Sequence, residues 1–85
     1  MHYSTHLLRH LRRTIGHNIH HWRAHKKLPL SKLASTTGIS ESMLDRYELG
    51  KHEIDVMALL KIACALGVEV GPLLEYRNVG EVACV

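Results

Sequence analysis

Apolar side chains recur at every third or fourth position through most of this chain, which is the spacing of one face of an α-helix. The first such stretch runs from Ser4 to about His25. It predicts one long helix, or two helices that meet at Gly16, because glycine weakens a helix by about 1 kcal/mol relative to alanine. Its apolar stripe consists of Leu8, Leu11, Ile15, Ile19 and Trp22. No alternating strand pattern occurs before residue 77, so we predict an all-α fold.

Four further helices are predicted at residues 29–36, 41–49, 56–66 and 72–76. Their limits are marked by residues that start or stop helices: Pro29, Ser40, Asp55 and Pro72 at the beginnings, and Gly38, Gly50 and Gly67 after the ends. Helix 56–66 has the strongest amphipathic pattern, and the side chains expected to face the core are Val56, Leu59, Leu60, Ala63 and Leu66. In helix 41–49, Leu44 and Tyr47 are expected to point inward.

The size and composition of the chain predict one small globular domain. Its 85 residues leave room for a single modest core, and 46% hydrophobic with 22% charged residues is ordinary for a folded protein. No apolar run approaches the roughly 18 residues of a membrane span, and the N-terminus lacks the pattern of a secretory signal, so we expect a cytoplasmic protein. Cys64 and Cys84 do not have the spacing of metal ligands and are expected to stay reduced.

Charge is distributed unevenly along the chain. Residues 1–40 contain seven Lys or Arg side chains and no acid, whereas residues 41–85 contain four basic and eight acidic side chains. A basic half joined to an acidic half suggests a polyanion, such as a nucleic acid, bound on one side of the molecule. The alternative is that the charges form only a solvated surface.

Several short motifs follow one another in an order and spacing that are known from other proteins. They are Ile19 with Arg23, Leu33-Ala34, Gly38-Ile39-Ser40, Tyr47-Glu48 with Gly50-Lys51, and Ile62-Ala63 with Ala65-Leu66-Gly67. Through these motifs residues 15–76 resemble the Cro/C1-type (XRE-like) helix-turn-helix family. The resemblance implies a compact five-helix, lambda-repressor-like domain that binds double-stranded DNA sequence-specifically. Residues 1–14 would then be an N-terminal helical extension and residues 77–85 a C-terminal tail.

The resemblance also implies a biological role. Such domains usually bind a palindromic operator as a homodimer, so we expect a small transcriptional repressor or autoregulator. No catalytic residue and no cofactor are expected, because no nucleophile lies beside an oriented base and no phosphate-binding loop occurs.

Specific residues are assigned by the same resemblance. Helix 41–49 corresponds to the recognition helix, in which Glu41, Ser42 and Arg46 match positions that meet base edges. Asp45 is grouped with them because it lies beside Arg46 and could align it. Arg23 and Glu48 match an ion pair that ties the first helix to the recognition helix.

Phosphate contacts are expected from the ends of helices and from the loop after the recognition helix. Ser40, Lys51 and His52 match positions at these places. Leu30 stands where the family often has a glutamine that grips phosphate, so only its backbone N–H could serve. Lys27 and Lys32 could supply the missing positive charge.

Two of the side chains on the recognition helix also have simpler explanations. Glu41 lies in the first turn, where a helix dipole favours an acid, although a carboxylate can also accept from the N4 amino group of cytosine. Arg46 could read guanine or could pair with Asp45 at the surface.

An alternative function is a protein-interaction module of the same fold, antitoxin-like or an adaptor, with weak or lost DNA binding. Leu30, Glu41 and Asp45 favour this alternative, since none of these side chains attracts phosphate. The C-terminal tail could then bind a protein partner by adding a strand to it.

The chain contains eight histidines, most of them in the first predicted helix. His6, His10, His17 and His21 would share the face opposite the apolar stripe. Pairs of imidazoles on adjacent turns can bind transition metals, but no carboxylate or thiolate is near in sequence, so we predict no metal site. Since histidines gain charge as the pH falls, DNA affinity is expected to rise between about pH 7.5 and 6.

The N-terminal extension is too apolar to be a free arm. Leu8, Leu11 and Ile15 are expected to pack on the domain or on a second subunit.

Overall fold

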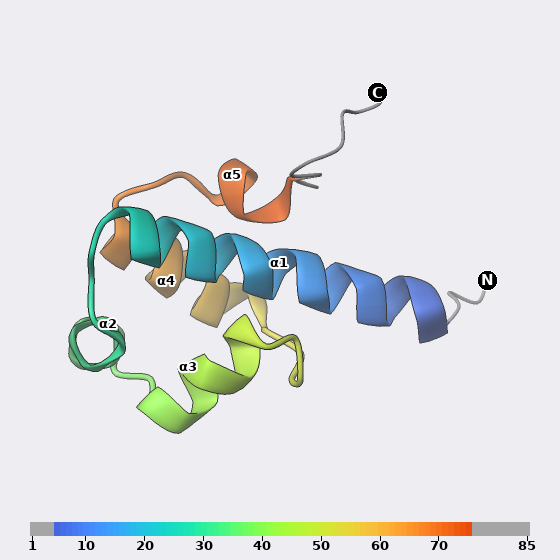
Figure 1. Cartoon of the computed structure of the whole chain (residues 1–85), viewed down its shortest axis with the longest axis horizontal. Helices are drawn as coiled ribbons and strands as arrows, with labels where there is room; N and C mark the ends of the chain where they lie inside the picture. The colour runs from blue at the N-terminus through green and yellow to red at the C-terminus, as the bar shows by residue number, and fades with distance from the viewer. Residues whose placement is uncertain (1–4, 76–85) are drawn as a thin grey trace.

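The computed structural model describes residues 5–75, which form five helices and no strand. The helices are α1 (Thr5–His25), α2 (Leu30–Thr37), α3 (Glu41–Glu48), α4 (Val56–Leu66) and α5 (Val70–Leu74). The all-α, five-helix prediction is confirmed. In Figure 1, α1 crosses the molecule between α5 on one side and α2 and α3 on the other, with α4 behind. The predictions for Tyr76 and for the tail at residues 77–85 lie outside the described residues.

Each helix contributes one fully buried aliphatic side chain to the core. These five side chains are Ile19, Leu33, Leu44, Ile62 and Leu73. Burying such a side chain stabilises a fold by about 1.5–3 kcal/mol, so each helix is held by at least one strong apolar contact. Among the described residues, no helix is long and apolar enough to cross a membrane.

α1 is one continuous helix, and the possible hinge at Gly16 is not present. Gly16 is buried against the end of α3: a Cβ atom there would overlap the carbonyl oxygen of Tyr47 and lie 2.8 Å from that of Glu48. Glycine is therefore placed here because two helices approach closely, a use of glycine that helix propensity does not reveal. α1 also runs without interruption across residues 14 and 15, where the extension was expected to end.

The predicted helix caps are largely confirmed. The Ser40 hydroxyl accepts a hydrogen bond from the Met43 amide at 3.1 Å, and the Asp55 carboxylate accepts one from the Ala58 amide at 2.8 Å. Pro29 precedes α2 as its N-cap rather than its first residue. α5 begins at Val70, two residues before the predicted start, because the first turn of a helix accommodates proline without losing a hydrogen bond.

Two apolar stripes are placed differently from the prediction. In α4 the buried residues are Ala58, Leu59, Ile62, Ala63 and Leu66. Val56 is 70% exposed and Leu60 44% exposed, so the prediction that both face the core is wrong. The sequence of α4, VMALLKIACAL, places apolar side chains on almost every side of the helix, so periodicity alone does not predict which face is buried.

The exposed part of the α1 stripe is the second case. Leu8 is 40% exposed and Leu11 44% exposed, whereas Ile15 and Trp22 pack against the core. The N-terminal part of α1 extends beyond the helices that pack on it (Figure 1). The packing of Leu8 and Leu11 on the domain of the same chain is therefore not observed, and a second subunit remains the other expectation.

Candidate nucleic-acid interface

α2 and α3 are joined by a tight turn that is fixed by hydrogen bonds. Gly38 takes a φ of 76° and its amide donates to the carbonyl of Ala34. Thr37 is buried, and its hydroxyl donates to the Leu33 carbonyl at 2.8 Å while accepting from the Ile39 amide at 3.2 Å. Thr37 was not among the predicted residues, although a hydroxyl side chain beside a glycine is a common turn signal. The two helices are thereby held as a helix-turn-helix unit.

α3 presents two distinct faces. Leu44 and Tyr47 are buried beneath it. The opposite face consists of exposed side chains, namely Glu41, Ser42, Asp45 and Arg46, with Leu49 just after the helix. Residues spaced by three or four positions lie on the same side of a helix, as do 41 and 45, 42 and 45, and 42 and 46, so the four candidate base-contact residues form one exposed surface.

Arg23 and Glu48 form a two-point ion pair between α1 and α3. Arg23 Nε donates to Glu48 Oε2 at 2.6 Å, and Nη2 donates to Oε1 at 3.1 Å. The side chains are only 17% and 7% exposed, respectively. The hydrogen bonds with Glu48 raise the pKa of Arg23 above its usual value, against the opposing effect of burial. The pair that the resemblance implied is thus present, and it fixes α3 relative to α1.

Two further contacts surround this pair, and neither was predicted from the sequence. Arg23 Nη1 donates to the carbonyl of Leu28 at 2.9 Å, which ties the connection between α1 and α2 to the same guanidinium. His20 Nδ1 lies 3.0 Å from Glu48 Oε1. One arginine of α1 therefore holds both the connection that leads to α2 and the end of α3.

The candidate phosphate-contact residues have exposed side chains, with one exception. Lys27, Lys32, Ser40, Lys51 and His52 are exposed. Leu30 is half-buried and its side chain packs against the core, so only its backbone amide could face a phosphate. The preceding Pro29 provides no side-chain cap for α2.

His52 is held in position by two neighbours. Its Nδ1 atom lies 2.8 Å from the carbonyl oxygen of Glu53, and its ring meets that of Tyr47 edge-on with centroids 5.9 Å apart. Because Tyr47 is anchored in the core, the loop after α3 has a defined position relative to the exposed face of α3.

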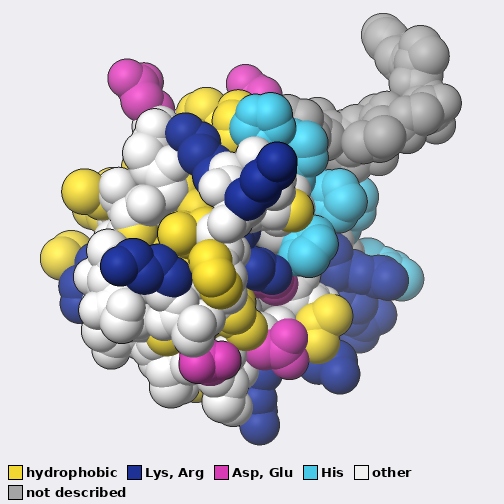
Figure 2. Space-filling view, turned by 60° about the vertical axis from the view of Figure 1, so that its left-hand side comes forward, with side chains coloured by type: hydrophobic (Ala, Val, Ile, Leu, Met, Phe, Trp, Pro, Cys, Tyr) yellow, Lys and Arg dark blue, Asp and Glu magenta, His cyan; other side chains and the backbone are white. Residues whose placement is uncertain are grey.

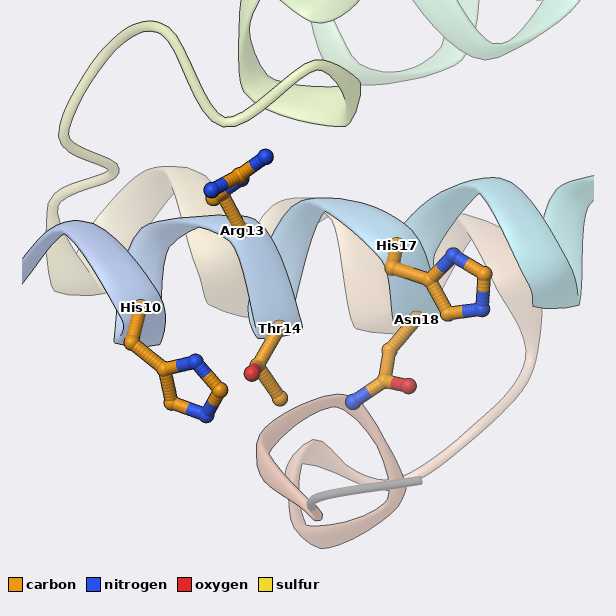
Figure 3. Close-up of a pocket in the computed structure, with 5 residues that line it drawn as sticks. All are labelled: His10, Arg13, Thr14, His17 and Asn18. Carbon is orange, nitrogen blue, oxygen red and sulfur yellow. The ribbon is translucent and has the colours of Figure 1, made fainter. Parts of the chain in front are cut away.

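Two clefts border α1. One, of about 300 Å³, separates α1 from α3 and is lined by His17, His20, Arg23, Asp45, Glu48 and Leu49. The other, of about 240 Å³, is lined by His10, Arg13, Thr14, His17 and Asn18 (Figure 3). Asn18 is fully buried and was not predicted: its Nδ2 donates to the carbonyls of Leu73 at 2.9 Å and Glu75 at 2.6 Å, which docks α5 on α1.

The histidines of α1 do not assemble a metal centre with other ligands. Within residues 5–75, no group of three or more His, Cys, Asp or Glu side chains is arranged to hold a metal ion. The rings of His21 and His25 stack with centroids 6.3 Å apart. Cys64 is a free, exposed thiol.

Comparison with known proteins identifies the arrangement. A family model described as helix-turn-helix, of the Cro/C1 type, matches residues 19–73. The chain belongs to the Cro/C1-type helix-turn-helix family. Membership in this DNA-binding family agrees with the exposed face of α3 and with the turn that precedes it.

Two solved structures of family members resemble this one closely. The restriction-modification controller protein C.AhdI from Aeromonas hydrophila has a TM-score of 0.71 and 27% sequence identity, covering 73% of this chain and 94% of that one. The clp gene regulator ClgR from C. glutamicum has a TM-score of 0.73 and 31% identity, covering 75% of this chain and 83% of that one. A search of curated proteins gave no significant match.

Proposed function

We propose that this Cro/C1-type protein is a transcriptional regulator that binds a specific palindromic DNA sequence as a homodimer, and that it acts as a small repressor or autoregulator. The observation that carries the proposal is the exposed face of α3, on which four polar side chains lie together. Beneath them, the Arg23–Glu48 pair and buried Leu44 and Tyr47 hold the helix. The names of C.AhdI and ClgR, a controller protein and a gene regulator, support the same class of function.

Base recognition is assigned to the exposed face of α3. Arg46 can donate two hydrogen bonds to O6 and N7 of guanine, a contact that discriminates by about 1–3 kcal/mol. Ser42 can donate to or accept from either kind of base edge, and Glu41 can accept from the N4 amino group of cytosine. Asp45, beside Arg46, can align its guanidinium. Both acids repel phosphate, which weakens non-specific binding more than specific binding.

Backbone recognition is assigned to the surroundings of α3. Lys27 precedes α2 and Lys32 lies in its first turn. The first amide of this helix, that of Leu30, can donate to a phosphate at the positive end of the helix dipole. Ser40, Lys51 and His52 lie at the two ends of α3. These contacts would fix the register of α3 on the duplex without reading its sequence.

The homodimer is supported by an apolar surface on α4. Val56, Met57 and Leu60 are 70%, 62% and 44% exposed, and they lie within two turns of one helix. Exposed apolar clusters commonly mark protein interfaces. A two-fold dimer would place two copies of α3 in successive major grooves, which is how a palindrome is read.

Selection of duplexes from a random DNA pool tests this function. We expect wild-type protein to enrich a palindrome, and Arg46→Ala to lose preference at one base pair of each half-site by a factor of about 10 or more. Lys61→Ala, an exposed α4 substitution that removes the same charge, serves as the control and should enrich the wild-type sequence. Recovery of no common sequence by wild-type protein would contradict the proposal.

The interaction module remains the second candidate, favoured by the two acids on the outer face of α3 and by the apolar side chain of Leu30. A protein of this kind would bind duplex DNA weakly at any sequence. Affinity measured at increasing salt concentration separates the two functions. For a DNA-binding regulator, log K falls against log salt concentration with a slope of about −0.9 per phosphate contacted.

A further inference from the structure

Arg9 and Arg13 continue the side of α1 that packs on α3. Residues 9, 13, 16 and 20 are separated by four, three and four positions, so they form one row along the helix. The last two members of this row touch α3: Gly16 abuts the carbonyls of Tyr47 and Glu48, and His20 contacts the Glu48 carboxylate. The first two members therefore emerge on the same side of α1 as the recognition helix.

Arg13 connects this row to the loop that follows α3. Gly50, with a φ of 70°, lies so close that a Cβ atom there would be 2.8 Å from Arg13 Cγ and 2.9 Å from Arg13 Cα. Figure 3 shows the Arg13 side chain directed toward this loop, away from Thr14 and Asn18. Its guanidinium consequently lies near the start of the loop that carries Lys51 and His52, the proposed phosphate contacts.

Both guanidinium groups are available to a partner. Arg9 and Arg13 are exposed, and within residues 5–75 neither forms a salt bridge. No acid occurs in the sequence before Glu41. In Figure 2, a group of Lys and Arg side chains lies beside the histidines on the right-hand side, and all but one of the described histidines belong to α1. This part of α1 is thus a concentrated positive surface.

We propose that Arg9 and Arg13 bind DNA phosphates just outside the segment that α3 and its following loop contact, so that the long α1 widens the DNA footprint. The chemistry is the pairing of guanidinium with phosphate, which is independent of sequence. Four residues of helix span about 6 Å, so the two side chains can reach different phosphates of one strand. This inference rests on the proposed function. Both residues precede the family match at residues 19–73, so the surface lies outside the matched domain.

The test compares wild-type protein with the double variant Arg9→Gln/Arg13→Gln over a range of KCl concentrations, on a duplex that carries the selected sequence and about ten further base pairs at each end. Because each substitution is present in both subunits of the dimer, we expect the slope of log K against log salt to become less steep by about 3.6 for the double variant and by about 1.8 for Arg9→Gln alone. Affinities for specific and random duplexes should fall by the same factor. Lys61→Gln removes one exposed charge elsewhere and should leave the slope unchanged.

The length of the DNA provides an independent readout. On a duplex trimmed to the selected sequence, wild type and double variant should bind equally. On a duplex with about ten added base pairs at each end, wild type should bind more tightly than the variant. Because Arg13 packs on Gly50, thermal unfolding of the double variant is measured as well. If the double variant does not fold, the same binding measurements are made with Arg9→Gln alone.

The outcomes separate this inference from the function on which it rests. Equal salt slopes and no effect of flanking DNA, with sequence selection intact, would overturn the role of Arg9 and Arg13 alone. Wild-type protein without salt-dependent duplex binding would overturn both.

Discussion

The acids of α3 have different roles because they lie on different sides of the helix. Glu48 is buried and accepts both hydrogen bonds from Arg23, whereas Glu41 and Asp45 are exposed. A pair of buried charges contributes more to the orientation of two helices than to net stability, because desolvation offsets much of the attraction. The exposed acids are free to act in base selection. A helix that faces phosphates can thus contain three acids without a contradiction.

Removing the Glu48 carboxylate should strongly destabilise the fold. In Glu48→Ala the guanidinium of Arg23 would stay mostly buried without its acid, which costs about 3 kcal/mol of unfolding free energy. Asp45→Ala, an exposed acid in the same helix, should change it by no more than about 0.5 kcal/mol. Urea denaturation of both variants measures the difference. Similar values for the two variants would show that the buried pair does not anchor α3.

Tyr47 should make stability fall at alkaline pH. Burial, with a smaller effect of the Asp55 charge, raises the pKa of Tyr47 above its ordinary value of 10. Above about pH 10 the unfolded chain releases the phenolic proton while the folded chain keeps it, so unfolding is favoured as the pH rises. Tyr47→Phe lacks this proton and should lose less stability between pH 9 and pH 11 in urea titrations. Parallel losses in the two proteins would refute the linkage.

The packing of α1 on α3 reverses the usual effect of replacing a glycine within a helix. Gly16→Ala would ordinarily strengthen α1 by about 1 kcal/mol. Here the new methyl group would meet the Tyr47 and Glu48 carbonyls, so we expect a net loss of about 2 kcal/mol or more, with α3 displaced. Gly71→Ala in α5 meets no atom within 4 Å and should be neutral or stabilising by up to about 1 kcal/mol. Thermal unfolding that ranks the two variants in the opposite order would contradict this.

Helix order and most helix limits could be predicted because they depend on local chemistry. Ser40 and Asp55 cap the next helix through hydrogen bonds to an amide three residues away, so the signal is contained in a few neighbouring residues. The starts of α2 and α5 differed by one and two residues, since proline is compatible with more than one place near a helix start.

Features that depend on long-range packing could not be predicted from the residues alone. The contact of Gly16 with Tyr47 and the hydrogen bonds from Asn18 to α5 join segments far apart in sequence. The buried face of α4 depends on which neighbours cover a helix that is apolar on nearly all sides. The ion pair of Arg23 and Glu48 was anticipated only through the family resemblance, because two opposite charges 25 positions apart give no local signal.

The proposed DNA contacts and the exposed apolar cluster of α4 lie on different helices, although α1 also exposes Leu7, Leu8 and Leu11. α3, its flanking loop and the adjoining row of α1 carry the proposed DNA contacts. The exposed apolar side chains Val56, Met57 and Leu60 belong to α4, whose covered side forms part of the core. A regulator that reads a palindrome needs both surfaces, because each subunit contacts only one half-site.

Association through α4 should therefore be sensitive to one charge. Met57 is 62% exposed, so Met57→Glu should fold normally but place two like charges across a two-fold interface. In sedimentation velocity, wild-type protein should be dimeric and Met57→Glu monomeric, with at least about tenfold weaker binding to the full palindrome because the two half-sites are no longer coupled. Met57→Leu keeps the apolar contact and should remain dimeric. A dimer that persists in Met57→Glu would show that this face of α4 is not the dimer interface. The exposed Leu8 and Leu11 of α1 would then be the next residues to test as an interface.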